Sequence, residues 1–153
     1  MIITDINKNV LKSFKPLQRL KEDLYVSAKN NRLTTVTEKV MIVYHNEKEI
    51  KFEGTYRIAR NKLVPVELDL DTDKTVNLDD FKLLKEFSFN MDVFQRYCYE
   101  NKILVDFYRL FSVLEKIEKL FDRFKFYVDE KTNRSLIHLE NENESILIFN
   151  KLL

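Results

Sequence analysis

The stretch VTEKVMIVYHNEKEIKFEGTYRIARNKLVPVELDL, residues 36–70, decides the fold class. Apolar side chains take alternate positions in three parts of it, and polar side chains stand between them. This period of two is typical of strands that bury one face of a sheet. With turns at 46–48 and 60–61, the stretch predicts a three-stranded antiparallel meander. The apolar positions are Val36, Val40, Ile42 and Tyr44, then Ile50, Phe52, Tyr56 and Ile58, then Val64, Val66, Leu68 and Leu70.

Two residues in this stretch carry specific predictions. Pro65 has no backbone N–H to give to a strand ladder, so the third strand is expected at a sheet edge or at a bulge. Gly54 is the single glycine of the chain and falls inside the second strand, on its apolar face. Glycine at such a place usually marks a bulge or the close approach of another side chain, and we expect one of the two here.

The segment before the meander has helical periodicity. This spacing predicts an amphipathic helix, which Pro16 either kinks or divides into two. Asn30 and Asn31 are expected to end it, because asparagine tolerates the left-handed conformation that closes many helices. The apolar positions are Ile6, Val10, Phe14, Leu17, Leu20, Leu24 and Ala28.

The polar side of this helix is basic and carries Lys8, Lys12, Lys15 and Arg19. Such residues can contact nucleic-acid phosphates or an acidic protein surface. They are also ordinary on the solvated side of an amphipathic helix. We retain these four as a candidate partner-binding face, with nucleic-acid binding as one alternative function.

Residues 77–100 predict two further helices. Asn77 and Asn90 are of the residue type that caps helix N-termini. Apolar residues follow each cap at helical spacing, and the phase breaks at Asn101 and Lys102. The inward positions are Leu78, Phe81, Leu84 and Phe87 in the first helix, and Met91, Phe94, Tyr97 and Cys98 in the second.

A heptad pattern begins at Ile103 and continues to Phe124. Alternating spacings of four and three residues predict one long helix. Its wide, Phe-rich stripe favours packing within the chain, and pairing with a second copy is the alternative. The seam that would form such a homodimer consists of Ile103, Phe107, Leu110, Leu114, Ile117 and Phe121.

The C-terminal part returns to strands. Short apolar runs at 126–128, 136–139 and 146–149 are separated by polar turns at 129–133 and 141–144. The whole chain, residues 1–153, is therefore expected to form one compact α+β domain in the order α-βββ-αα-βββ. The antiparallel meanders are expected to pack on the long central amphipathic helix.

Composition excludes several classes of function. One glycine among 153 residues leaves no phosphate-binding loop for ATP, GTP or NAD. Cys98 is the single cysteine, so we expect no disulfide framework and no cysteine-rich zinc site. The N-terminus has no signal-peptide pattern and no apolar run is long enough to span a membrane. We therefore expect a cytoplasmic protein without a cofactor.

The chain has a net charge of +1, but residues 67–80 form an acidic segment. We interpret this segment as a candidate surface for a basic partner. Its spacing resembles a calcium-binding loop, but Lys74 stands where that loop needs glycine, so no metal site is predicted. The acidic residues are Glu67, Asp69, Asp71, Asp73, Asp79 and Asp80.

A second resemblance concerns nucleases. The order α-β-β-β-α, with Glu53, Glu67 and Asp69 on one sheet face, resembles the PD-(D/E)xK nuclease core. That resemblance implies metal-dependent cleavage by carboxylates and a lysine. Asp69 stands where the family places its lysine, so the alternative is a degenerate nuclease.

The favoured function is non-enzymatic binding of another macromolecule, most often a protein. Frequent Lys, Asn, Ile and Phe indicate an AT-rich genome, as in many phages and mobile elements. An inhibitor of a host enzyme or defence complex fits this composition and the scarcity of catalytic motifs. The sequence therefore predicts a small protein-binding or inhibitor module with no catalytic residues.

Overall fold

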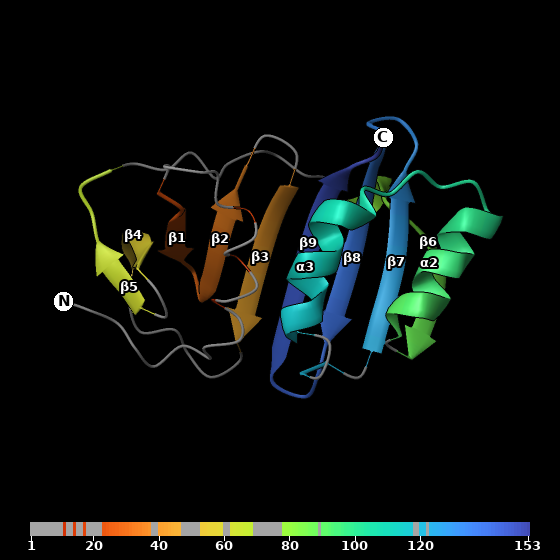
Figure 1. Cartoon of the computed structure of the whole chain (residues 1–153). Helices are drawn as coiled ribbons and strands as arrows, with labels where there is room; N and C mark the ends of the chain where they lie inside the picture. The colour runs from red at the N-terminus through yellow and green to blue at the C-terminus, as the bar shows by residue number, and fades with distance from the viewer. Residues whose placement is uncertain are drawn as a thin grey trace.

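The computed structural model describes residues 11, 14, 17, 23–37, 40–46, 53–59, 62–68, 78–88, 90–117, 120–121 and 123–153, without the side chains of Arg109 and Lys116. In this part of the chain, nine antiparallel strands form a single sheet, and two α-helices accompany it (Figure 1). The coarse α+β class is thus as predicted, although strands dominate.

The sheet has the order β5-β4-β1-β2-β3-β9-β8-β7-β6. Pro65 ends β5, which is an edge strand as expected for a residue without an N–H. The strands are β1 (Tyr25–Lys29), β2 (Arg32–Val36), β3 (Val40–Asn46), β4 (Gly54–Ala59), β5 (Lys62–Pro65), β6 (Lys82–Ser88), β7 (Arg123–Asp129), β8 (Arg134–Glu140) and β9 (Glu144–Lys151). The helical elements are the 3-10 turn η2 (Leu78–Asp80), α2 (Met91–Glu100) and α3 (Phe107–Ile117).

Two similar halves meet in the middle of the sheet. Each half contains a three-stranded meander, β1-β2-β3 or β7-β8-β9, and each meander follows helical backbone: Leu11 and Phe14 in the first half and α3 in the second. The halves join where β3 pairs with β9, with Val43 opposite Leu147.

Both helices lie on one face of the sheet (Figure 1). The buried core lies between them and the strands, and Phe94 of α2 is at the centre of an aromatic cluster. Its ring centroid lies 4.8 Å from that of Phe124 and 4.9 Å from that of Phe126, both in edge-to-face contact. Phe87 and Phe107 complete the cluster. These rings fix α2 against β7.

The ends of α2 are as predicted. The Asn90 side chain accepts hydrogen bonds from the backbone N–H groups of Asp92 and Val93, which satisfies two donors that the helix cannot pair itself. The helix ends at Glu100, and Lys102 has a φ of 55°. The break expected at residues 101–102 is therefore confirmed.

The N-terminal helix was predicted to continue to Asn30, and this is wrong. Residues 25–29 form β1, where Val26 and Ala28 are buried and their neighbours are not. Asn30 and Asn31 have φ angles of 51° and 65° and connect β1 to β2 as a two-residue hairpin turn. Such turns need positive φ at both residues, which asparagine accepts in place of glycine.

The short helix predicted at residues 78–88 is also wrong beyond its first turn. Only Leu78–Asp80 are helical, and β6 follows. Phe81 and Phe87, which one helix face would bring together, belong to two separate apolar clusters. The register of β6 on β7 shifts between Leu83 and Lys85, so Leu84 is a bulge residue.

The long central helix is not confirmed. α3 ends at Ile117, and Phe124 belongs to β7. Phe124 and Phe126 are buried, whereas Arg123 and Lys125, which precede them, are less buried. This alternation is typical of a strand. The heptad pattern extended too far because the first apolar residue of the strand coincides with a heptad position.

The first meander differs from its prediction in its partners. β4 pairs with β1 and β5, and β3 pairs with β2 and β9. The predicted order α-βββ-αα-βββ is therefore wrong, because it omits β1, β2 and β6. Val36, predicted to share a strand with Val40, ends β2 instead. The C-terminal meander β7-β8-β9 lies where it was predicted.

Gly54 has a different role from the expected one. The register between β4 and β1 runs without a shift at Gly54, and an added Cβ would meet only the Tyr56 ring at 3.9 Å. Neither a bulge nor a close approach explains the glycine. Its φ of +121° does, because side-chain-bearing residues rarely adopt that angle. The glycine also begins β4 and is exposed, where a buried interior position had been expected.

Candidate functional site

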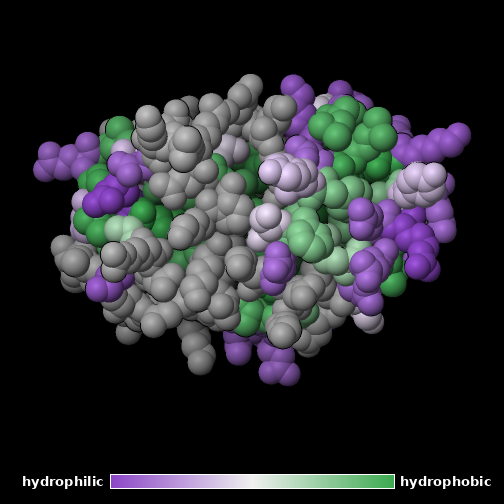
Figure 2. All heavy atoms as spheres, in the orientation of Figure 1, coloured by the Kyte–Doolittle hydropathy of each residue, from purple (hydrophilic) through white to green (hydrophobic). Residues whose placement is uncertain are grey.

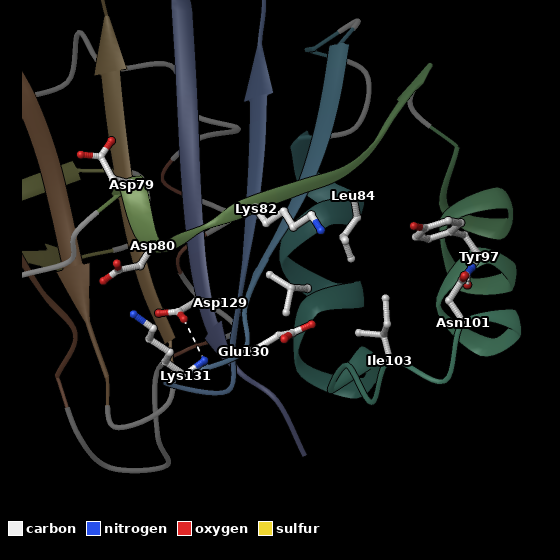
Figure 3. Close-up of a pocket in the computed structure, with 11 residues that line it drawn as sticks. Asp79, Asp80, Lys82, Leu84, Tyr97, Asn101, Ile103, Asp129, Glu130 and Lys131 are labelled. Carbon is white, nitrogen blue, oxygen red and sulfur yellow. Dashed lines mark hydrogen bonds between the residues drawn. The ribbon is translucent and has the colours of Figure 1, made fainter.

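A pocket of about 580 Å³ lies between η2, β6, the end of α2 and the β7–β8 turn (Figure 3). Acidic residues come from η2 and from the turn, whereas Tyr97, Asn101 and Ile103 come from the α2 side. Figure 3 shows Lys82 and Leu84 of β6 between these two groups. The residues that line the pocket are Asp79, Asp80, Lys82, Leu84, Tyr97, Asn101, Ile103, Val128, Asp129, Glu130 and Lys131.

The carboxylate of Asp129 is held by the turn that follows β7. The Lys131 backbone N–H donates to its Oδ1 at 3.0 Å, and the Thr132 hydroxyl donates to its Oδ2 at 2.7 Å. The Thr132 hydrogen bond, aided by those of the backbone and by the Lys131 charge, holds the pKa of Asp129 below its usual value against the opposing effect of burial. The carboxylate therefore stays ionised and fixed in position.

The pocket combines charge with an apolar wall. Four carboxylates face two lysines around it, and Leu84, Tyr97, Ile103 and Val128 supply apolar surface. This combination suits a cationic group on an apolar stem, such as the side chain of lysine or arginine. Within the described residues, no group of three or more His, Cys, Asp or Glu side chains is placed to hold a metal ion.

Two residues of the predicted acidic segment reach this pocket. Asp79 and Asp80 line it, and Glu67 is exposed after β5. Asp69, Asp71 and Asp73 lie outside the described residues. Asp129 and Glu130 were missed, because sequence analysis assigned them only to a turn. Their place beside η2 follows from the pairing of β6 with β7, which brings Lys82 opposite Val128 and which no local pattern predicts.

A second surface is the outer face of α3. Tyr108 and Phe111 are three residues apart and lie along one side of the helix, and Leu104 lies in the segment just before it. The three side chains are 92%, 49% and 62% exposed, in that order. Leu153 is also exposed, and its N–H donates to the carbonyl of Leu104 at 2.9 Å. Figure 2 shows apolar surface gathered over α3 and beside the C-terminus. We call these four residues the outer stripe.

The residues of the predicted dimer seam face the other way. Leu110, Leu114 and Ile117 are fully buried, and Phe121 is nearly so. Ile103 and Phe107 are partly buried against the same core. The seam therefore packs within the chain, as the favoured interpretation of the heptad pattern expected. Any contact of α3 with another molecule would use the outer stripe.

The predicted basic helix face lies outside the described residues, since Lys8, Lys12, Lys15 and Arg19 all belong to the undescribed part of the N-terminal segment. Leu11 and Phe14 from the same segment are described and are fully buried in the core. The two apolar positions thus lie inward, as the amphipathic pattern predicts.

Cys98 and the nuclease-like acids are of residue types that can take part in catalysis. Cys98 is buried in α2, and burial raises the pKa of its thiol to about 12. A thiol with such a pKa carries almost no thiolate at neutral pH, which disfavours a nucleophilic role. Of the nuclease-like acids, Glu53 precedes β4 and Glu67 follows β5, both exposed, and Asp69 lies outside the described residues.

No protein-family model matches the chain, and no curated protein sequence matches it either. Among the described helices, none has the length and apolar character needed to cross a membrane.

Proposed function

We propose that this chain is a protein-binding module whose partner docks on the outer stripe of α3. The observation that carries the proposal is the exposure of Tyr108 and Phe111 on one side of a helix whose other side is already buried, with Leu104 exposed just before the helix. Single exposed apolar residues are common on soluble proteins, but contiguous apolar patches mark interaction sites. Tyrosine and phenylalanine are also among the residues that interfaces favour.

The chemistry of the partner follows from the neighbouring pocket. Leu104 begins the outer stripe, and the residue before it, Ile103, lines the acidic pocket. A partner segment that covers both would present apolar side chains to α3 and a lysine or arginine to Asp80 and Glu130. This is the basic partner expected for the acidic segment, of which Asp79 and Asp80 line the pocket.

The test uses two variants with matched changes. Tyr108→Lys/Phe111→Lys places two charges on the outer stripe. Val93→Lys/Tyr99→Lys places two charges on exposed apolar positions of α2, which are 43% and 86% exposed. Wild-type protein first captures its partner from cells that produce the chain, and the purified partner is then titrated against all three proteins.

We expect the outer-stripe variant to bind at least tenfold more weakly and the α2 variant to bind like the wild type. Equal affinity of all three proteins would refute the docking surface. Light scattering on the isolated chain gives a second outcome: a dimer that the outer-stripe variant dissociates would mean that a second copy, and not another protein, occupies the stripe.

The finer form of the proposal is inhibition of a host enzyme or defence complex by a phage or mobile-element protein. It rests on composition and on the shortage of catalytic motifs in the sequence. If the captured partner is an enzyme, its activity should fall with saturating wild-type protein and recover with the outer-stripe variant. Unchanged activity at saturation would reduce the proposal to binding alone.

A further inference from the structure

We propose that the face of the sheet opposite the helices binds the phosphate backbone of a nucleic acid. This inference concerns a different surface from the outer stripe and does not rest on the proposed function. It begins with the register of the strands, because residues directly paired across strands share one face.

One row of paired residues crosses seven strands. Lys29 pairs with Arg32, Arg32 with His45, and His45 with Ser145. Ser145 then pairs with Glu140, Glu140 with Arg123, and Arg123 with Ser88. We call these seven residues the polar row. Adjacent strands lie about 4.8 Å apart, so the row extends over roughly 29 Å. That length corresponds to about nine base pairs of duplex at roughly 3.4 Å each.

The whole face has an excess of positive charge. Alternation along each strand and pairing between strands assign to it eight lysine and arginine residues, two histidines and three acidic residues. The cations are Lys29, Arg32, Arg57, Lys62, Arg123, Lys125, Arg134 and Lys151, the histidines are His45 and His138, and the acids are Glu86, Asp129 and Glu140. The complete chain has a net charge of only +1, so this face concentrates the basic residues.

The three carboxylates offset only part of the charge of the eight lysine and arginine residues and leave a formal excess of five. Glu140 is shared by three groups: Lys125 Nζ at 3.4 Å, His138 Nε2 at 3.8 Å and Arg123 at 4.0 Å. Asp129 is 3% exposed, and its oxygens already accept hydrogen bonds from the β7–β8 turn. The excess cations therefore have charge to offer to a polyanion.

Most described strand residues of this face are at least partly exposed. Both α-helices lie on the opposite side of the sheet (Figure 1). Among the described strand residues of this face, only Leu136, Phe149 and Asp129 are buried, and Phe81 covers the first two. The polar row lies at the other end of the strands from this small apolar cluster, since Phe149 pairs with Met41 and not with His45.

The cations and hydroxyls of the polar row are groups that contact phosphates, and contacts to phosphates carry no sequence information directly. Binding should therefore be independent of sequence and strongly dependent on salt. With Lys29, Arg32, Arg123 and Lys125 each on one phosphate, the affinity for duplex should fall roughly a hundredfold between 50 and 200 mM salt.

The experiment titrates fluorescent 20-mers of single-stranded DNA, duplex DNA and RNA with the full chain at several salt concentrations. Arg32→Glu/Arg123→Glu reverses two charges of the polar row. Arg96→Glu/Lys102→Glu, on the helix side, makes the same change in net charge. Circular dichroism and thermal unfolding confirm that both variants are folded.

We expect saturable binding of at least one 20-mer, with at least a tenfold loss and a flatter salt dependence in the polar-row variant only. The 20-mer that binds most tightly identifies the kind of nucleic acid that the face prefers. The proposal is overturned if no 20-mer binds at 50 mM salt, or if both variants lose affinity equally. Binding of poly-glutamate in preference to every 20-mer would also overturn it, because the site would then recognise acidic protein.

Discussion

Tyr44 of β3 donates its phenolic hydrogen to the carboxylate of Glu144, the first residue of β9. The two residues belong to different halves of the sheet and are 100 positions apart in the chain. Burial, and after it the Glu144 hydrogen bond and charge, raises the pKa of Tyr44 well above its usual value. The phenol therefore remains a hydrogen-bond donor, and this bond links β3 to β9 where the two halves of the sheet meet.

The first prediction concerns this bond. Tyr44→Phe should lower the free energy of unfolding by about 1–2 kcal/mol, because a hydrogen bond to a charged group is lost from a partly buried site. Urea denaturation of Tyr44→Phe, Glu144→Gln and the double variant measures the coupling between the two side chains. Tyr127 is half-buried on the face of the sheet opposite the helices, so Tyr127→Phe serves as the control. It should lower the free energy of unfolding by less than about 0.5 kcal/mol. A coupling near zero would contradict the assignment.

The second prediction concerns Gly54. Gly54→Ala should destabilise the protein by about 1–3 kcal/mol, because alanine would have to adopt a φ of +121°. The nearest contact of the new Cβ, at 3.9 Å, is ordinary, so the cost would come from the backbone alone. Thermal unfolding compares this variant with Thr55→Ala in the same strand, which should cost less than about 1 kcal/mol. Equal stabilities would show that the backbone at position 54 is not constrained.

The third prediction contrasts two residues on opposite sides of α3. Leu110 is fully buried, and Leu110→Ala should cost about 2–5 kcal/mol. Tyr108 is 92% exposed, and Tyr108→Lys should change the free energy of unfolding by less than about 0.5 kcal/mol. Urea denaturation of both variants tests the orientation of the helix. A large loss for Tyr108→Lys would mean that the outer stripe packs within the chain.

The fourth prediction concerns pH. Burial lowers the pKa of His138 below 6.5, against the opposing effect of the Glu140 charge. The unfolded chain then binds a proton more readily than the folded chain, so stability should fall as the pH drops below about 6.5 and level off below the folded-state pKa. Denaturation at several pH values between 7.5 and 5 measures this slope. His138→Gln should flatten it, and an unchanged slope would assign the effect to other groups.

The fifth prediction concerns Cys98. Its side chain is fully buried and its thiol pKa is about 12, so a thiol reagent at pH 7.5 should label the native protein very slowly. Labelling should become rapid in denaturant. Mass spectrometry of timed samples follows the reaction. Rapid labelling under native conditions would show that α2 opens readily from the sheet.

The predictions that were confirmed are those that depend on one local property of the backbone. The N-cap at Asn90, the break after Glu100 and the edge position of Pro65 follow from hydrogen bonds that the residue can or cannot make. The apolar runs at 126–128, 136–139 and 146–149 were clear enough to place β7, β8 and β9 approximately. Each of these features depends on residues within a few positions of one another.

The errors have a common physical cause, which is that a short apolar run fits either a helix or a strand. Phe81 and Phe87 share a helix face in sequence but belong to separate clusters of the folded chain. Phe124 continues the heptad spacing but lies in β7. In both places pairing with a distant strand decided the outcome, and tertiary contacts of that kind leave no local signal.

The candidate site was predictable only in part for the same reason. The acidity of Asp79 and Asp80 was evident, but their pocket needs Glu130 and the end of α2. The exposure of the outer stripe was not predicted from the sequence. The polar row required the strand register, which depends on the pairing of β3 with β9.

That pairing has a consequence for biosynthesis. Strand β3 is complete at residue 46, but its neighbour β9 starts at residue 144. At translation rates of about 5–20 residues per second, β3 would wait on the order of 5–20 s with an unpaired edge. Unpaired strand edges are templates for aggregation. The middle of the sheet is thus the last part to form, and ribosome-associated chaperones would be needed most while residues 47–143 are being made.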